Sequence, residues 1–192
     1  DFASWMGAQP HRLKIVVPGN HDMILDAEYY DEFWPDWSPV KESHEAARRA
    51  FGRNGVRLLI DESIKFDGLH LHGSPWVLRY ASWRTAFNRT PAEIEGIWRG
   101  LPEGVDVLIT HQPPHGFGDR DLTGKRTGCP HLATRVGELR PRLHVFGHVH
   151  SDAGVFEPRP GDPTTRLNAS CVCDFYRVGA RSAHIVDVPV GS

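Results

Sequence analysis

The sequence predicts an α/β protein: a layered β-sheet sandwich flanked by helices. Three short, mostly apolar runs, at 13–17, 105–109 and 143–146, have the length and composition of buried strands. Helical patterns lie between them, and such an alternation along the chain favours a layered sheet. The 192 residues suffice for one hydrophobic core, so we expect a single domain over residues 1–192.

The helices are predicted from periodicity and end signals. Residues 1–7 resemble the end of a helix, and residues 43–54 carry a helical apolar pattern that Gly55 stops. Thr90 precedes Pro91, an arrangement typical of a capped helix start. Residues 130–139 form the last predicted helix, whereas the aromatic residues, acids and prolines of segment 26–39 predict irregular structure.

Further short strands complete the prediction. Asp67-Gly68 has the composition of a hairpin turn between two of them. We expect these strands at 56–60, 63–66, 69–71, 167–173 and 183–188.

Charge, hydropathy and cysteine usage limit the function classes. The formal net charge of −2 provides no field for non-specific nucleic-acid binding, so no nucleic-acid partner is expected. No apolar stretch approaches the roughly 20 residues of a membrane span, and no signal sequence opens the chain, so no membrane partner is expected. Three cysteines are an odd number, which favours a reducing, cytoplasmic compartment over a disulfide framework.

Histidine-bearing stretches follow each of the three principal strands. In an open α/β sheet, ligands gather beyond the carboxyl ends of the strands, so these loops are predicted to converge. One amide and three or four imidazoles would then form a metal site. The stretches are Gly19-Asn20-His21-Asp22, Thr110-His111-Gln112-Pro113-Pro114 and Gly147-His148-Val149-His150.

In this order, the three stretches resemble the last three motifs of the calcineurin-like metallophosphoesterases. Three further segments are similar to the subgroup of metallophosphoesterase-domain-containing proteins, which is itself similar to class III cyclic-nucleotide phosphodiesterases. The resemblance extends over nearly the whole chain from about Trp5. The segments are Gly128-Cys129, Arg140–Gly147 and Asn168-Ala169-Ser170.

The resemblance implies hydrolysis of phosphoesters, diesters and cyclic nucleotides included, by two divalent metal ions about 3.5–4 Å apart. It places Asn20, His111 and His148 on the second metal and His150 on the first. The mixed nitrogen and oxygen donors suit Mn, Fe, Zn or Ni.

Other residues are expected to serve the substrate. The resemblance places His21 against the phosphoryl oxygens or the leaving alkoxide, and Asp22 is expected to orient His21. In the loop after Pro113-Pro114, His115 and Arg120 are the predicted substrate-binding residues, with Asp119 beside them.

The chain departs from the family pattern upstream. The family has Asp-x-His and Gly-Asp motifs before Gly-Asn-His, which supply first-metal ligands and the bridging carboxylate, and this chain has neither there. We therefore expect it to be the C-terminal portion of a metallophosphoesterase domain without the N-terminal strands, and to be inactive alone.

Competing interpretations stay open at this point. A truncated protein of the same fold could act as an inactive scaffold or binding protein, or three histidines could form a mononuclear zinc module. His70 and His72 share the spacing of His148 and His150 but are interpreted as an ordinary strand face. The Cys-x-Cys at 171–173, which could bind a metal, is interpreted as core thiols.

Overall fold

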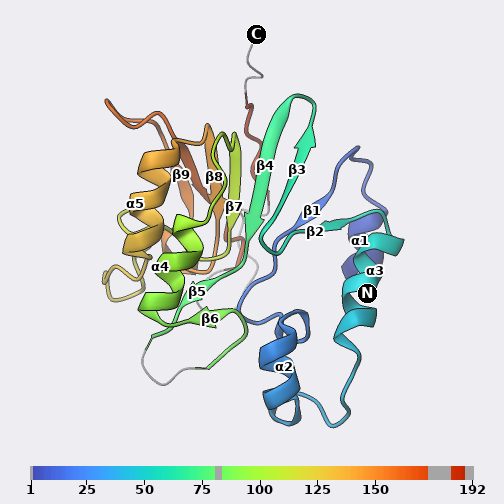
Figure 1. The fold of residues 1–192 in the computed structure, drawn as a ribbon. Coiled ribbons are helices and arrows are strands. Elements are labelled where there is room, and N and C mark those ends of the chain that lie inside the picture. Colours follow the sequence, from blue (N-terminus) through green and yellow to red (C-terminus); the bar gives the residue numbers. More distant parts are fainter. Residues whose placement is uncertain (1, 81–83, 173–182, 189–192) are drawn as a thin grey trace.

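The computed structural model describes residues 2–80, 84–172 and 183–188. Its centre is a six-stranded sheet, and the structure is mixed α/β as the sequence predicts (Figure 1). Neighbouring strands β4, β7, β8 and β10 are parallel, while β3 and β9 pair antiparallel at the two edges. In sheet order the strands are β3 (Glu62–Phe66), β4 (Leu69–Ser74), β7 (Val107–Thr110), β8 (Leu143–Phe146), β10 (Thr165–Asn168) and β9 (Gly154–Phe156).

Helices α4 (Pro91–Arg99) and α5 (Pro130–Leu139) lie together on one side of the sheet (Figure 1). Trp98 of α4 and Leu132 of α5 are fully buried with Leu108 of β7 in one hydrophobic cluster. The helices therefore pack on β7, the strand that directly precedes the predicted ligand His111.

The opposite face of the sheet is also apolar. Leu71, Val107, Leu143 and Leu167 are buried there, and Val186 and Val188 pack against them. Residues 183–188 belong to no helix or strand, so the strand predicted there is wrong. A segment that packs its alternate side chains on the sheet has the same apolar pattern as a strand, even when it does not pair with one.

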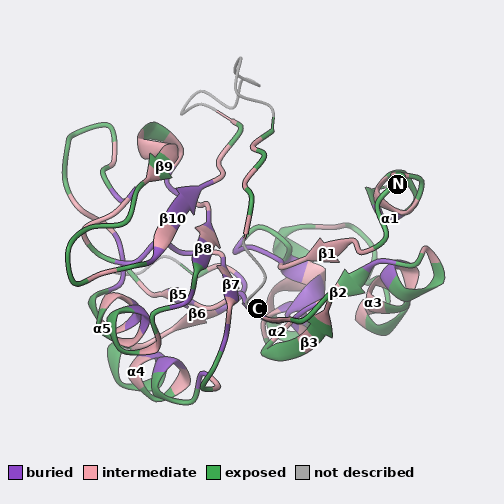
Figure 2. Cartoon of the chain, turned by 90° about the horizontal axis from the view of Figure 1, so that it is seen from above, coloured by how far each residue is buried: buried purple, intermediate pink, exposed green. Residues whose placement is uncertain are grey.

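The N-terminal part forms a second group of elements. Figure 2 shows it beside the main sheet, with its strand pair between two of its helices and that sheet. Parallel strands β1 (Ile15–Val16) and β2 (Arg57–Leu58) accompany helices α1 (Phe2–Gly7) and α3 (His44–Arg53). The strand predicted over 13–17 is limited to residues 15 and 16 because only these two pair with β2.

Segment 26–39 is not irregular as predicted. Asp26 accepts a hydrogen bond from the Tyr29 backbone N–H and caps helix α2 (Ala27–Phe33), and a 3-10 helix (Trp34–Asp36) follows. Tyr30 is buried in a cluster with Phe87, so a contact distant in sequence stabilises this helix.

Short elements complete the described chain. Strands β5 (Val77–Leu78) and β6 (Asn88–Arg89) form a separate parallel pair that the sequence did not predict. One 3-10 turn, Met23–Leu25, follows the first histidine loop, and another, His150–Asp152, begins at the last residue of the third. The hairpin turn is confirmed, since Asp67 and Gly68 both have positive φ, 48° and 80°.

Candidate metal centre

Two predicted ligands extend from the same edge of the main sheet. His111 directly follows β7, and His148 follows β8 by two residues. The two strands are parallel neighbours with Ile109 opposite Val145, so their carboxyl ends coincide. The Gly147 N–H donates to the His111 carbonyl at 3.0 Å, which joins the two loops.

Asn20 reaches this point from the loop after β1. Its Oδ1 lies 2.8 Å from His111 Nε2, and His148 Nδ1 lies 3.1 Å from the same nitrogen. A glycine at position 19 permits the approach, because a Cβ there would lie 2.5 Å from the His111 ring. The predicted convergence of the three loops is therefore observed.

The Gly19–Asp22 turn is closed by its own hydrogen bonds. The Gly19 N–H donates to the Asp22 carboxylate at 2.6 Å, and the Asp22 N–H donates to the Gly19 carbonyl at 3.0 Å. Asp22 thus holds the turn that carries Asn20 and His21. Within the described residues, its carboxylate makes no hydrogen bond to His21, which is exposed.

Both central imidazoles are neutral. Burial, the neighbouring His148 and then the more distant His21 and His150 hold the pKa of His111 well below its usual range. Burial, His150 and His21 lower the pKa of His148 to about 4. Neutral imidazoles keep the lone pairs that metal coordination requires.

The loop of His148 adopts an unusual backbone conformation. His148 has φ of 71°, a left-handed value that costs free energy for a residue with a side chain. Asn168 supports the loop, since its buried amide donates to the carbonyls of Val149 and Gly118 at 2.8 and 2.9 Å.

These donors fit a divalent ion of the transition series. Two donors at right angles, each about 2.1 Å from an ion, lie about 3.0 Å apart, close to the observed 2.8 and 3.1 Å. Two imidazole nitrogens and one amide oxygen are also suitable donor types. Among the described residues, no group of three or more His, Cys, Asp or Glu side chains is placed to hold a metal, so the amide is an essential part of this set.

A cavity of about 590 Å³ opens beside the three donors. His21 and His150 also line it, so the structure brings both to the predicted site. His115 and Arg120 are exposed and lie outside its lining, and the Arg120 guanidinium donates to the Gly124 carbonyl at 3.0 Å.

The remaining histidines and cysteines have separate surroundings. Buried His72 shares a 2.8 Å hydrogen bond with Ser63, as an ordinary strand residue would. Cys129 is buried, whereas Cys171 is exposed and so is not the core thiol that we expected; Cys173 lies outside the described residues. Asp119 does not face substrate, because it is buried and accepts hydrogen bonds from Gly116, Gly128 and Arg126.

Three residues near the centre were missed by sequence reasoning. Asn168 belongs to a segment of the resemblance but had no assigned role. Tyr80 lines the cavity and donates to the Thr127 carbonyl at 2.5 Å, and Thr85 contacts Asn20. Tyr80 and Thr85 belong to no motif that the sequence displays.

Comparison with known proteins agrees with the fold. Residues 2–152 match the family described as calcineurin-like phosphoesterase. Human metallophosphoesterase domain-containing protein 1 is 34% identical over 197 residues, which cover 98% of this chain and 59% of the human protein. A UPF0046 protein of Caenorhabditis elegans is 30% identical over 204 residues, covering 99% of this chain and 50% of its own. A solved crystal structure superposes with a TM-score of 0.59 at 20% identity, over 88% of this chain and 61% of its own.

The chain belongs to the calcineurin-like phosphoesterase family, and its similarity to the metallophosphoesterase-domain-containing subgroup is confirmed. It spans between half and three-fifths of the length of these two relatives. Within the described residues, no helix has both the length and the apolar character needed to cross a lipid bilayer.

Proposed function

We propose that this protein hydrolyses phosphoesters, preferably phosphodiesters, at a dinuclear centre of divalent metal ions. The observation that carries the proposal is the convergence of Asn20, His111 and His148, three neutral donors from three separate loops. Family membership supports the same reaction class.

The side chains divide into two roles under this proposal. Asn20, His111 and His148 would hold one ion and His150 the other, with Mn, Fe, Zn or Ni as candidates. Bound metal ions neutralise charge on the phosphoryl group and supply hydroxide near neutral pH. His21, exposed at the cavity, would donate a proton to the leaving alkoxide as its bond to phosphorus breaks.

The cavity supports a small substrate. Its volume of about 590 Å³ is within the roughly 300–1,000 Å³ range of small-molecule pockets. We therefore propose a small phosphoester, a cyclic nucleotide included, as the partner of this site. The predicted contacts of His115 and Arg120 with substrate stay predictions.

The test is hydrolysis of a chromogenic aryl phosphodiester by the protein at its natural length, with Mn²⁺, Fe²⁺, Ni²⁺ and Zn²⁺ supplied in turn. We expect metal-dependent turnover that exceeds turnover of the matching monoester. Absence of turnover with all four ions would refute the enzyme proposal in favour of a binding or scaffold protein.

A stoichiometry measurement tests the dinuclear part separately. Among the described residues, the metal-binding groups that converge in the centre are two imidazoles and one amide, and no carboxylate joins them. We therefore expect the 192-residue chain alone to bind at most one ion and to be inactive. Two tight Mn²⁺ sites in a calorimetric titration would show that its own carboxylates complete the centre.

A further inference from the structure

Asn20 can serve as a metal ligand in only one orientation. Its amide ends in an oxygen, which can coordinate a cation, and an NH₂ group, which cannot. A half-turn of the amide exchanges the two with almost no change in shape. Because Asn20 is buried, 7% exposed, its amide orientation depends on hydrogen-bonding partners inside the protein.

Thr85 is the partner of the amide nitrogen. Asn20 Nδ2 donates to the Thr85 hydroxyl oxygen at 3.3 Å, while Asn20 Oδ1 faces His111. For this bond, the hydroxyl must present a lone pair to Asn20 and direct its hydrogen elsewhere. Thr85 therefore selects the useful orientation only if its own hydrogen is held.

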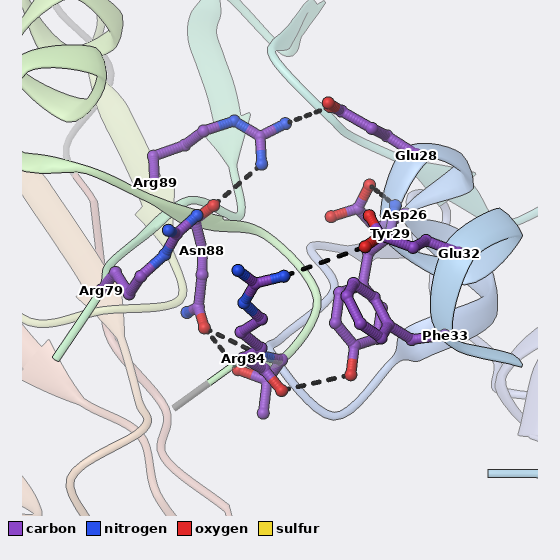
Figure 3. A pocket seen from close by; sticks show the side chains of 10 residues that line it. Asp26, Glu28, Tyr29, Glu32, Phe33, Arg79, Arg84, Asn88 and Arg89 are labelled. Carbon is purple, nitrogen blue, oxygen red and sulfur yellow. Dashed lines mark hydrogen bonds and ion pairs between the residues drawn. The ribbon is translucent and has the colours of Figure 1, made fainter. Parts of the chain in front are cut away.

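Asn88 holds that hydrogen. The Thr85 hydroxyl donates to Asn88 Oδ1 at 2.9 Å, and the Thr85 backbone N–H donates to the same oxygen at 2.9 Å. Figure 3 shows the Asn88 side chain directed toward the segment that carries Arg84, with both bonds drawn. A backbone N–H can only donate, so it fixes which end of the Asn88 amide faces Thr85.

The Thr85 backbone N–H sets the direction of the hydrogen bonds that link Asn88, Thr85 and Asn20. It orients Asn88, Asn88 orients the Thr85 hydroxyl, and the hydroxyl orients Asn20. Asn88 is itself fixed in strand β6, opposite Val77 of β5. The series ends with the Asn20 oxygen toward the imidazoles of His111 and His148.

We propose that Thr85 and Asn88 are positioning residues that fix the Asn20 carbonyl oxygen toward the metal. This inference rests on the proposed function, because it assumes that Asn20 binds a metal ion. Hydrogen-bonding partners behind a metal ligand are typically worth about 10–100-fold in metal affinity. The two residues also border a separate cavity of about 160 Å³ (Figure 3), so small changes of side chain can be accommodated there.

The experiment measures Mn²⁺ affinity by calorimetry for the protein at its natural length and for three variants of it. Thr85→Val keeps the shape and removes the hydroxyl, so Mn²⁺ should bind about 10–100-fold more weakly. Thr85→Ser restores the hydroxyl and should bind nearly as tightly as wild type. Asn88→Leu removes the acceptor for the hydroxyl and should weaken binding as Thr85→Val does, which keeps the test decisive if Thr85→Val fails to fold.

A double variant separates amide orientation from packing. Asn20→Asp places an oxygen at both ends of the side chain, so its orientation no longer matters. Thr85→Val should then weaken Mn²⁺ binding much less in the Asn20→Asp background than in wild type. An equal loss in both backgrounds would overturn the inference.

The remaining outcomes are also distinct. If wild type binds Mn²⁺ and Thr85→Val binds equally well, the positioning role is refuted and the proposed function stands. If Thr85→Val and Thr85→Ser are weakened alike, the effect is structural and the inference is wrong. If wild type fails to bind any Mn²⁺, the proposed function and the inference fall together.

Discussion

The two sides of the metal centre are held by different forces. His111 and His148 extend from parallel strands β7 and β8, and α4 and α5 pack on β7 with a buried apolar layer. Asn20 lies on a loop after the two-residue strand β1, and polar contacts place it. Strand register therefore aligns one side of the centre, whereas individual hydrogen bonds align the other.

The difference has a consequence for robustness. A sheet distributes its alignment over many backbone hydrogen bonds, so a single side chain has limited influence on where a strand ends. The Asn20 loop depends on Asp22, Thr85 and the absence of a side chain at Gly19. We therefore expect conservative changes near Asn20 to alter metal binding more than changes within the helical layer.

The largest expected effect separates the roles of the two sides. His148→Ala removes a sheet-borne ligand and should lower both metal content and turnover. His21→Ala alters an exposed side chain of the loop, so metal content should stay near normal while turnover falls about 10²–10⁴-fold. Metal analysis beside steady-state kinetics measures both, and equal metal loss would show that His21 is a ligand.

A smaller substitution tests how closely the loop must approach the sheet. Gly19→Ala would place a Cβ 2.5 Å from the His111 ring, so the loop or the ring must move. Because Asn20 follows directly, Mn²⁺ affinity should fall by about the 10–100-fold typical of disturbed ligand support.

A matched glycine provides the control. A Cβ at Gly52 in α3 would meet nothing within 4 Å, so Gly52→Ala should leave Mn²⁺ affinity unchanged. The helix should gain about 0.5–1 kcal/mol of stability from the loss of glycine. Unchanged Mn²⁺ affinity in Gly19→Ala would mean that the loop adapts freely and that metal binding does not depend on its close approach to the sheet.

Sequence alone predicted the sheet side better than the loop side. Helix α5 and strand β8 begin and end at the predicted residues. Their signals are local: Pro130 at the first helical position, and a short apolar run after Arg140, which takes the left-handed conformation that ends α5. Both histidine loops on this side follow from the same local pattern.

The missed features depend on distant partners. Helix α2 was missed because segment 26–39 combines aromatic residues with prolines, although both prolines lie after the helix. Tyr30 of α2 gains its burial from a cluster that includes Phe87. Strands β5 and β6 have two residues each and are defined by pairing with one another. Thr85 supports Asn20 across 65 positions of sequence, a separation that local patterns do not encode.

The strand pair beneath the ligands should be sensitive to acid. His144 of β8 is fully buried, and its Nε2 shares a 2.9 Å hydrogen bond with the Thr110 hydroxyl at the end of β7. Burial and then Arg166 lower the pKa of His144 to about 3, from 6.5 for an ordinary histidine. The folded state thus favours the neutral ring. The contribution of His144 to the free energy of unfolding is therefore complete above pH 6.5 and is lost progressively as the pH falls toward 3.

His144→Gln can keep a donor for Thr110 but does not titrate. Between pH 7 and pH 5, the unfolding free energy of wild type should fall by about 2 kcal/mol more than that of the variant, since one pKa unit corresponds to about 1.4 kcal/mol. Denaturant titrations at the two pH values measure the difference. Parallel losses in wild type and variant would show that His144 is not responsible.

The smallest expected effect concerns the start of α4, within the helical layer. The Thr90 hydroxyl accepts from the Glu93 N–H at 3.4 Å, and the Glu93 carboxylate accepts from the Thr90 N–H at 2.8 Å. Removing such a cap costs about 1 kcal/mol, so Thr90→Ala should lower the unfolding free energy by that amount.

Thr134→Ala is the control, because the Thr134 hydroxyl donates within α5 without capping it, and the change in unfolding free energy should stay within about 0.5 kcal/mol. Both variants should retain wild-type Mn²⁺ affinity, since the register of β7 and β8 does not depend on one helix end. A loss of Mn²⁺ affinity in Thr90→Ala would show that the sheet side is as easily disturbed as the Asn20 loop.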